Sequence, residues 1–194
     1  MDKGIRQTLT GQSFNYRCIT KLEVNFLYEV TLVVLKPDAI ERNLIGSIIK
    51  RYENAGLKID DLKYYQKVTE SLIEKHYPPS MALSIGRKAQ KVVKGIDDPE
   101  AQGKKVLKRL RKYFTRGPVV AIKIGGEDAI QSVRDITGYT DPTTAKKGTI
   151  RGDLGIDSLE KSTDERRACE NLVHASGNKE EAMTELELWF PSSK

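Results

Sequence analysis

The chain has 194 residues and carries 33 lysines and arginines against 27 aspartates and glutamates, a net charge of +6. Its apolar fraction of 38% supports one ordinary core and excludes a chain that is disordered throughout, because disorder combines few apolar residues with a high net charge. The longest apolar runs fall far short of the ~20 residues that span a bilayer, and no signal segment opens the chain, so we expect a cytoplasmic protein.

The N-terminal part predicts an extension and a first strand. Residues 1–28 contain no strong periodicity, and we interpret them as an extension of a domain that spans residues 29–194. The β-branched run at 30–35 predicts a strand. Pro37 ends it, because proline cannot donate a sheet hydrogen bond.

A helix, a strand and a short helix are predicted next. Asn43 is a suitable N-cap for a helix that Gly56 ends. Residues 57–68 read as a second strand, and residues 71–77 as a short helix before two prolines. The apolar positions of the first helix follow helical spacing: Ile45, Ile48, Ile49 and Tyr52.

Residues 80–116 form a basic insert. They hold eleven cations and three anions, a local charge of +8, so the rest of the chain is mildly acidic. Asp98 and Pro99 are typical of a helix start, and apolar residues follow at helical spacing with cations on the other face. Such a patch suits a phosphate or nucleic-acid surface, but a charge run is more commonly a solvated helix face. No aromatic residue that could stack on a base occurs before Tyr113.

The C-terminal half completes an α+β pattern. A long segment at 138–164 is rich in glycine, proline and threonine, and we expect it to be an irregular functional loop. The other expected elements are a strand at 119–124, a helix at 127–137, a short helix at 165–170, a short helix from 178 and a last strand at 186–190. This order predicts a ferredoxin-like α/β sandwich, in which helices cover one face of a four-stranded antiparallel sheet, plus the helical insert.

No glycine-rich phosphate cradle is present, so phosphate chemistry would require side-chain donors around a covalent nucleophile. His174 is the candidate, since a neutral imidazole can attack phosphorus and the small neighbours Ala175 and Gly177 leave its ring accessible. Glu185 could accept a hydrogen bond from the other ring nitrogen and fix the tautomer. A lone histidine is more commonly structural, and a hydrolase pair of Cys169 with His174 lacks evident oxyanion donors.

Three cations on separate segments could converge on a triphosphate. Lys36 follows the first strand, Arg134 lies in a predicted helix and Arg151 lies in the long loop. Each alone would be interpreted as a solvated surface charge. Phosphoryl transfer depends on positioning and charge stabilisation, however, and the string at 148–153 favours a joint role for the three.

Several motifs between about residues 31 and 190 resemble those of the nucleoside diphosphate kinase family, in its order and near its spacing. A long form of that family, with a basic insert, is the most similar. The motifs are Leu35-Lys36-Pro37-Asp38, Gly117-Pro118-Val119-Val120-Ala121, Gly138-Tyr139-Thr140-Asp141-Pro142, Gly148-Thr149-Ile150-Arg151-Gly152-Asp153, Asn171-Leu172-Val173-His174-Ala175-Ser176 and Leu188-Trp189-Phe190. The resemblance implies a Mg²⁺-dependent ping-pong exchange of the terminal phosphate between nucleoside tri- and diphosphates, through a phosphohistidine.

The resemblance also implies roles for residues of this chain. His174 matches the phosphorylated histidine, and Glu185 matches the acid that orients it. Lys36 and Tyr77 match the pair near the transferred phosphate. The other matches are Ser176 as a nearby hydroxyl, Arg134, Thr140 and Arg151 as phosphate binders, and Asn171 with Lys36 at the ribose. Mg²⁺ is held mainly through the nucleotide phosphates, so no metal-ligating residue is implied.

Two departures from the family pattern stand out. The phenylalanine that stacks on the base is absent, and counting places Ile85 there, with Leu83 as the alternative. Gly177 replaces an acidic residue. The resemblance implies a homo-oligomer, with a hexamer favoured and a tetramer or dimer left open. The alternative function is a nucleic-acid-binding protein that uses the basic insert, which is secondary because the whole catalytic set is present.

Overall fold

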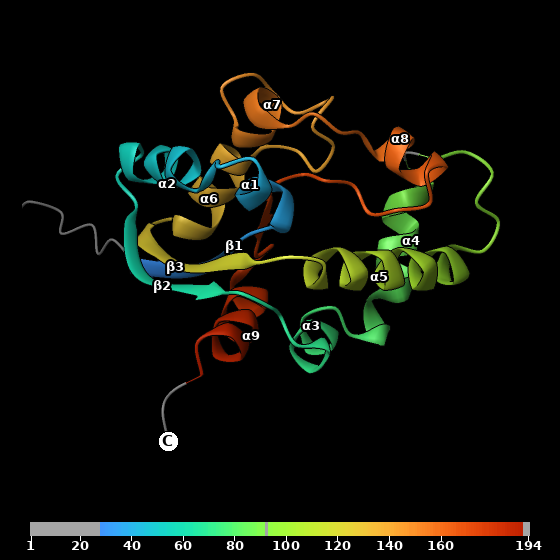
Figure 1. Ribbon diagram of the computed structural model, residues 1–194, viewed down its shortest axis with the longest axis horizontal. Coiled ribbons are helices and arrows are strands. Elements are labelled where there is room, and N and C mark those ends of the chain that lie inside the picture. Colours follow the sequence, from blue (N-terminus) through green and yellow to red (C-terminus); the bar gives the residue numbers. More distant parts are fainter. Residues whose placement is uncertain (1–27, 92, 192–194) are drawn as a thin grey trace, which may run out of the picture.

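A four-stranded antiparallel sheet forms the centre of the computed structural model, which describes residues 28–91 and 93–191 (Figure 1). The expected extension at 1–28 therefore lies outside the described residues, apart from its last position. The strand order β2-β3-β1-β4 is that of a ferredoxin-like sandwich, as the sequence predicts. The strands are β1 (Tyr28–Leu35), β2 (Lys58–Tyr65), β3 (Val119–Glu127) and β4 (Val173–Ala175).

Helices cover both faces of this sheet, and the expectation of helices on one face is wrong. Figure 1 shows α2 and α6 above the sheet and α3 and α9 below it. The helices are α1 (Pro37–Glu41), α2 (Ile45–Asn54), α3 (Glu70–His76), α4 (Ala82–Gln90), α5 (Pro99–Thr115), α6 (Ala129–Thr137), α7 (Ile150–Leu154), α8 (Leu159–Asp164) and α9 (Lys179–Trp189), with a 3₁₀ turn at Pro79–Met81. Across the described ranges, none of these helices combines the length and apolarity that a membrane crossing needs.

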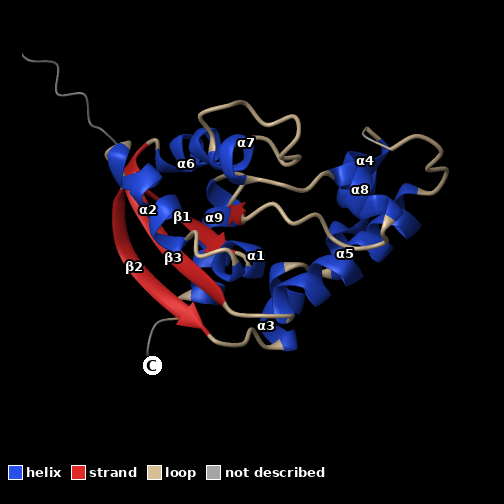
Figure 2. Cartoon of the chain, turned by 45° about the horizontal axis from the view of Figure 1, so that its top comes forward, coloured by secondary structure: helices blue, strands red, loops and turns tan. Residues whose placement is uncertain are grey.

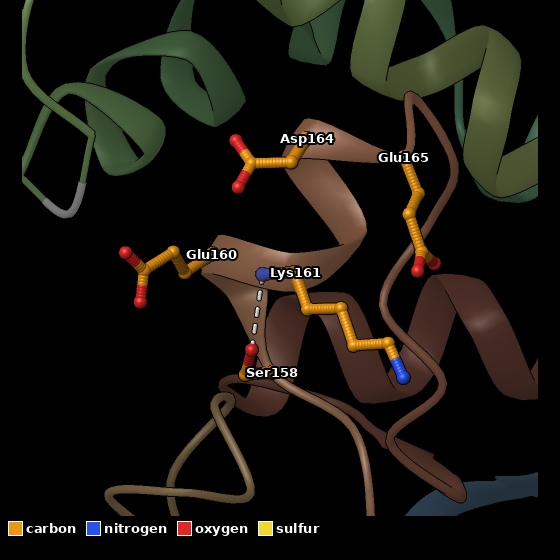
Figure 3. Close-up of a pocket in the computed structure, with 5 residues that line it drawn as sticks. All are labelled: Ser158, Glu160, Lys161, Asp164 and Glu165. Atoms are coloured by element: carbon orange, nitrogen blue, oxygen red, sulfur yellow. Dashed lines mark hydrogen bonds between the residues drawn. The ribbon is translucent and has the colours of Figure 1, made fainter.

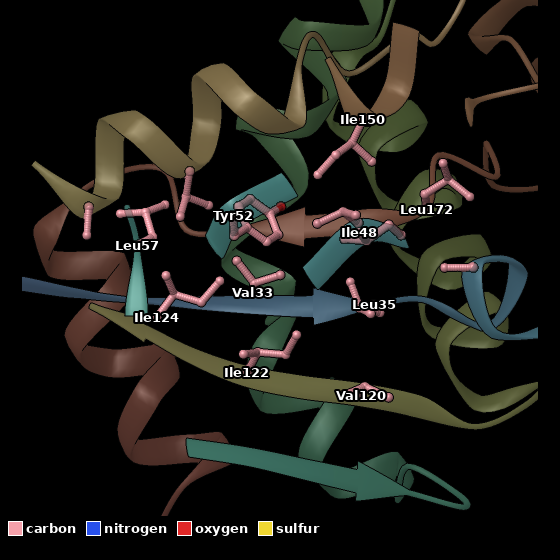
Figure 4. Close-up of a cluster of buried hydrophobic side chains, with 14 residues drawn as sticks. Val33, Leu35, Ile48, Tyr52, Leu57, Val120, Ile122, Ile124, Ile150 and Leu172 are labelled. Carbon is pink, nitrogen blue, oxygen red and sulfur yellow. The ribbon is translucent and has the colours of Figure 1, made fainter. Parts of the chain in front are cut away.

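The central strand β1 divides its side chains between two apolar clusters. Val33 and Leu35 pack with residues of α2, α6 and α7 on one face, the cluster drawn in Figure 4. Leu32 and Val34 pack on the other face, with residues of α3, α5 and α9. Because both faces are buried, β1 is apolar at successive positions rather than at alternate ones.

The basic insert folds into a helical hairpin made of α4 and α5, which projects to one side of the sheet (Figure 2). Asp98 caps α5 as expected, since its carboxylate accepts a hydrogen bond from the Ala101 N–H at 3.0 Å. The two helices meet backbone to backbone at Gly86 and Gly103. A Cβ at Gly86 would lie 1.5 Å from the carbonyl oxygen of Pro99, so only glycine permits this approach.

The expected last strand at 186–190 is wrong, because this segment belongs to α9. Asn178 caps that helix by accepting a hydrogen bond from the Glu181 N–H, and Ala182, Glu185 and Trp189 are buried at helical spacing. The fourth strand is the short β4 instead, which pairs antiparallel with β1. Glu185 therefore lies within a helix and not at the start of a strand.

Three further expectations are corrected. The segment expected to be an irregular loop contains α7 and α8, and the expected helix at 165–170 is wrong, because Ser158 caps α8 earlier in the chain. Asn43 does not cap α2, whose N-cap is Leu44 without a side-chain hydrogen bond. Asn43 instead takes a left-handed conformation, with φ of +56°, between α1 and α2.

Candidate active site

His174 lies on β4, at the edge of the sheet, where it pairs with Val34 of β1. Its side chain is 16% exposed, so the ring is neither sealed inside the protein nor freely solvated. The position of the ring follows from the pairing with β1 and from the turn that precedes β4. This turn contains Leu172, a buried residue with a left-handed φ of +67°.

Glu185 holds one nitrogen of the His174 ring. Both carboxylate oxygens lie 2.9–3.0 Å from Nε2, and one of them also accepts the hydroxyl of Ser176 at 2.6 Å. Burial opposes ionisation of Glu185, but the charge and hydrogen bond of His174 prevail and lower the pKa of the carboxyl to about 2. An ionised carboxylate only accepts, so Nε2 carries a proton, and in the neutral form of the ring the lone pair is on Nδ1.

His76 packs against the ring of His174 and is itself held by Trp189. The sequence does not reveal this arrangement. The Trp189 indole N–H donates to Nδ1 of His76 at 3.2 Å, and the His76 ring lies 4.4 Å from the His174 ring, centre to centre. Burial, together with the neighbouring His174, lowers the pKa of His76 to about 3, so its imidazole is neutral. A neutral His76 adds no positive charge beside His174.

Lys36 joins the site from the end of β1. Its ammonium donates to the Asn171 side-chain oxygen at 2.6 Å and lies about 5.5 Å from the rings of Tyr113 and Phe114. Burial and the charge of Arg151 lower the pKa of Lys36 to about 7, against the opposite influence of Asp38. A cation that is buried with so little compensation is poised to accept an anion.

Arg151, on α7, is also buried, and it clamps the backbone around the site. Its guanidinium donates to the carbonyl oxygens of Asn171 at 3.0 Å, Gly138 at 2.8 Å and Val173 at 2.5 Å. Three of its five N–H donors are thereby used, and two remain for another acceptor. Burial lowers the pKa of Arg151. The side chain thus fixes the turn before His174.

Three predicted residues remain: Tyr77, Thr140 and Arg134. Tyr77 is largely buried, with its ring 6.2 Å from that of His174. Thr140 is exposed, and its carbonyl oxygen accepts from the Asn171 side chain at 2.8 Å. Arg134 is exposed on α6, close enough to Arg151 to lower the pKa of that guanidinium. No measured contact places Arg134 against the His174 ring.

The pocket shown in Figure 3 is a different feature. It is an open depression on α8, and none of the residues selected from the sequence lines it. Glu160 and Asp164 extend to one side of α8 and Lys161 and Glu165 to the other (Figure 3), and Ser158 caps the helix by accepting from the Lys161 N–H at 3.0 Å. The lining residues are Ser158, Glu160, Lys161, Asp164 and Glu165. This depression therefore gathers none of the candidate residues, whereas His174, Glu185 and Ser176 lie in hydrogen-bond contact with one another.

The donors around His174 do not suit a protein-held Mg²⁺. His76, His174 and Glu185 each offer an atom within 4.8 Å of the others, but magnesium prefers oxygen ligands and two of these are imidazoles. Asp38, the other carboxylate beside Lys36, already accepts from Tyr113 and from a backbone N–H. A magnesium ion fits this site only when nucleotide phosphates supply its oxygens.

The chain is similar to known proteins along most of its length. A family profile described as nucleoside diphosphate kinase matches residues 29–94 and 98–194. The nucleoside diphosphate kinase of Pyrobaculum aerophilum is 42% identical over 174 residues, covering 84% of this chain and 94% of that protein. That of Clostridium perfringens is 39% identical over 163 residues, covering 84% and 92%.

Solved structures agree with this match. A crystal structure of an NDP kinase from Pyrobaculum aerophilum superposes with a TM-score of 0.78 at 40% identity, covering 85% of this chain and 97% of that one. A nucleoside-diphosphate kinase from Borrelia burgdorferi, described as a transition-state mimic with bound vanadate and ADP, superposes with a TM-score of 0.74 at 32% identity, covering 86% and 89%.

Proposed function

The chain belongs to the nucleoside diphosphate kinase family, and we propose that it carries the terminal phosphate of a nucleoside triphosphate to a nucleoside diphosphate on His174. The observation that carries the proposal is the pair of His174 and Glu185. The carboxylate binds Nε2, so the lone pair of Nδ1 is available at a partly exposed ring. The Borrelia burgdorferi relative is described with bound ADP and vanadate, which supports a nucleotide as the substrate of this chain.

In the first half-reaction, Nδ1 of His174 forms a bond to the terminal phosphorus while the bond from phosphorus to the bridging oxygen breaks. The nucleoside diphosphate leaves with that electron pair, and the Nε2–H group of His174 keeps its hydrogen bond to Glu185. In the second half-reaction, a terminal oxygen of another diphosphate attacks the phosphohistidine and restores the free ring. The Ser176 hydroxyl keeps the carboxylate in place throughout.

The cations of the site bind the charged part of the nucleotide. Lys36 and Asn171 bind the ribose hydroxyls, and Lys36 with Tyr77 lies by the transferred phosphate. The phosphates are bound by Arg134, Thr140 and Arg151. Mg²⁺ enters as part of the nucleotide substrate, on phosphate oxygens, and screens their charge. Leu83 is exposed on α4 while Ile85 is partly buried, which favours Leu83 as the base contact.

Phosphate trapping tests this proposal. Incubation with ATP labelled on the terminal phosphate and Mg²⁺ is expected to give a base-stable, acid-labile phosphate in the wild-type chain and none in His174→Asn. Equal melting temperatures of the two proteins would show that the variant is folded. Label that survives in His174→Asn, or its absence from the wild type, would contradict the proposal.

We further propose a homo-oligomer, with a hexamer favoured. Within the described part of the chain β2 pairs only with β3, so one of its edges is open, and Leu62 and Tyr64 expose apolar surface there. Light scattering during size-exclusion chromatography is expected to give about six times the 21.8 kDa chain mass. A monomer at micromolar concentration would contradict the assembly without affecting the enzymatic proposal.

Nucleic-acid binding by the basic hairpin is a secondary proposal, and location in the cytoplasm stays a prediction. The exposed lysines of α5 support the former, and Lys104 is already paired with Glu100 at 2.7 Å. Binding of RNA or single-stranded DNA would weaken steeply with salt, and a change of Lys105 and Lys108 to glutamine would reduce that dependence. A salt-independent affinity would contradict it.

A further inference from the structure

The turn before His174 stores backbone strain. Leu172 lies two residues before the ring and has φ of +67°, a conformation that costs a non-glycine residue on the order of 1–2 kcal/mol. The residue is completely buried. Such a conformation persists only where neighbouring groups hold it, and the direction in which β4 leaves the turn depends on them.

Asp38 and Lys36 hold both peptide groups of this turn. The Leu172 N–H donates to Oδ2 of Asp38 at 3.1 Å, and the Leu172 carbonyl oxygen accepts from the Lys36 backbone N–H at 2.8 Å. The Asp38 side chain comes from α1 and is 2% exposed. The backbone of Lys36 and the side chain of Asp38, at the junction of β1 and α1, therefore hold Leu172 on both sides.

The second oxygen of Asp38 connects the site to the basic hairpin. Oδ1 accepts the phenolic hydroxyl of Tyr113, which is buried near the end of α5. Burial and the charge of Asp38 raise the pKa of Tyr113, so the phenol remains a donor. The insert thus reaches the catalytic turn through one side chain, whereas its lysines lie on the exposed surface.

Asp38 also supplies negative charge beside buried cations. Lys36 is surrounded by Arg151 from α7, by His76 from α3, by Cys169 and by the side-chain oxygen of Asn171. Among the ionisable groups that act on it, Arg151 disfavours its protonation, while Asp38 and, more weakly, Cys169 favour it. Cys169 is buried, and burial raises its pKa to about 12, so the thiol is neutral. Asp38 is thus the stronger of the two groups that oppose the effect of Arg151 on Lys36.

We propose that Asp38, braced by Tyr113, is a positioning residue of this site: it holds the Leu172 turn that places His174, and it provides the charge that balances Lys36. The inference rests on the proposed function, because its readout is phosphotransfer. It also gives α5 a role in catalysis that does not involve the surface charge of the insert. Asp38 acts through Leu172 and Lys36 and touches no substrate.

Two variants separate the parts of this proposal. Asp38→Asn keeps the size and an acceptor for the Leu172 N–H but removes the charge. The alkaline limb of kcat/KM, which reports the free enzyme and falls as Lys36 loses its proton, is then expected to move about one pH unit lower. Tyr113→Phe keeps the charge and loses the brace. It is expected to slow phosphohistidine formation about tenfold, with KM and the alkaline limb unchanged.

Tyr28→Phe is the matched control, since Tyr28 also donates its hydroxyl to an aspartate, Oδ1 of Asp60 at 2.8 Å, and lies at the start of β1, the opposite end of that strand from Lys36. It should leave the phosphorylation rate unchanged. A wild-type limb in folded Asp38→Asn, or an unchanged rate in Tyr113→Phe, overturns the inference. If Asp38→Asn does not fold, Tyr113→Phe decides alone. Absence of phosphohistidine from the wild type would instead refute the proposed function.

Discussion

Replacement of Glu185 by glutamine tests the centre of the site. The side chain is 9% exposed, and its carboxylate accepts from His174 at 2.9–3.0 Å and from Ser176 at 2.6 Å. Glutamine keeps the volume and one acceptor but loses the charge. The variant should therefore be folded, and the effect should report the ionised carboxylate rather than a cavity.

The magnitude follows from the pKa of Glu185, which is about 2 in the folded chain against an ordinary 4.5. Because the folded carboxyl has the lower pKa, its stabilisation is complete above pH 4.5 and is lost as the pH falls toward 2. The difference corresponds to about 3 kcal/mol while the His174 ring is charged, of which more than half is lost by pH 3. The gap in unfolding free energy between wild type and variant should narrow accordingly.

Urea unfolding at pH 7, 5, 4 and 3 measures this gap for the wild type, Glu185→Gln and Glu187→Gln. Glu187 is on the same helix, α9, and is exposed, so its substitution should change stability by less than about 0.5 kcal/mol at every pH. A gap that stays constant with pH would show that the carboxylate is not held in its ionised form by His174. An equal gap for Glu187→Gln would point to a general charge effect.

Three other substitutions test the scaffold. Gly86→Ala should destabilise the chain by about 1–3 kcal/mol in urea unfolding, since the new Cβ would meet the Pro99 carbonyl oxygen; wild-type stability would contradict the backbone contact. Arg151→Lys should cost about 2 kcal/mol or more by the same measure, because one ammonium cannot replace three fixed N–H donors. Arg166→Gly should raise the urea midpoint, with a gain of about 0.5–1 kcal/mol, because Arg166 is exposed with φ of +52°.

The strands and helix starts that depend on local chemistry could be predicted from the sequence. The apolar run that becomes β1 and the Asp98 cap of α5 each depend on neighbouring residues, and both are confirmed. The alternation of Leu186 and Leu188 with charged residues predicts a strand at 186–190, whereas the structure has a helix there. The carboxylate of Glu185 points inward to His174. Because this buried position of α9 holds a charged residue, the helical spacing of apolar residues is obscured in the sequence.

Only part of the site could be predicted from the sequence, because some of its contacts join residues that lie far apart in the chain. His174 and Glu185 are eleven residues apart, and a motif can suggest that they meet. Asp38 meets Tyr113 across 75 residues and Leu172 across 134, and these contacts have no periodicity that a sequence displays. The folded structure at the junction of β1 and α1 is needed to see that Asp38 contacts both Tyr113 and Leu172.

The charge of the site leads to a last prediction. Burial and Arg151 lower the pKa of Lys36 to about 7, so at pH 8 the free chain leaves most of its Lys36 ammonium groups deprotonated. A bound phosphate restores the proton, and ADP binding should take up about 0.9 proton per site, since ADP itself is fully deprotonated at this pH. Calorimetry in Tris and in HEPES would then give binding enthalpies that differ by this uptake multiplied by the difference between the ionisation enthalpies of the two buffers. The difference should persist in Lys112→Met, on the exposed face of α5, and vanish in Lys36→Met. Equal enthalpies for the wild type in both buffers would show that Lys36 already carries its charge in the free chain, which would contradict a pKa of about 7.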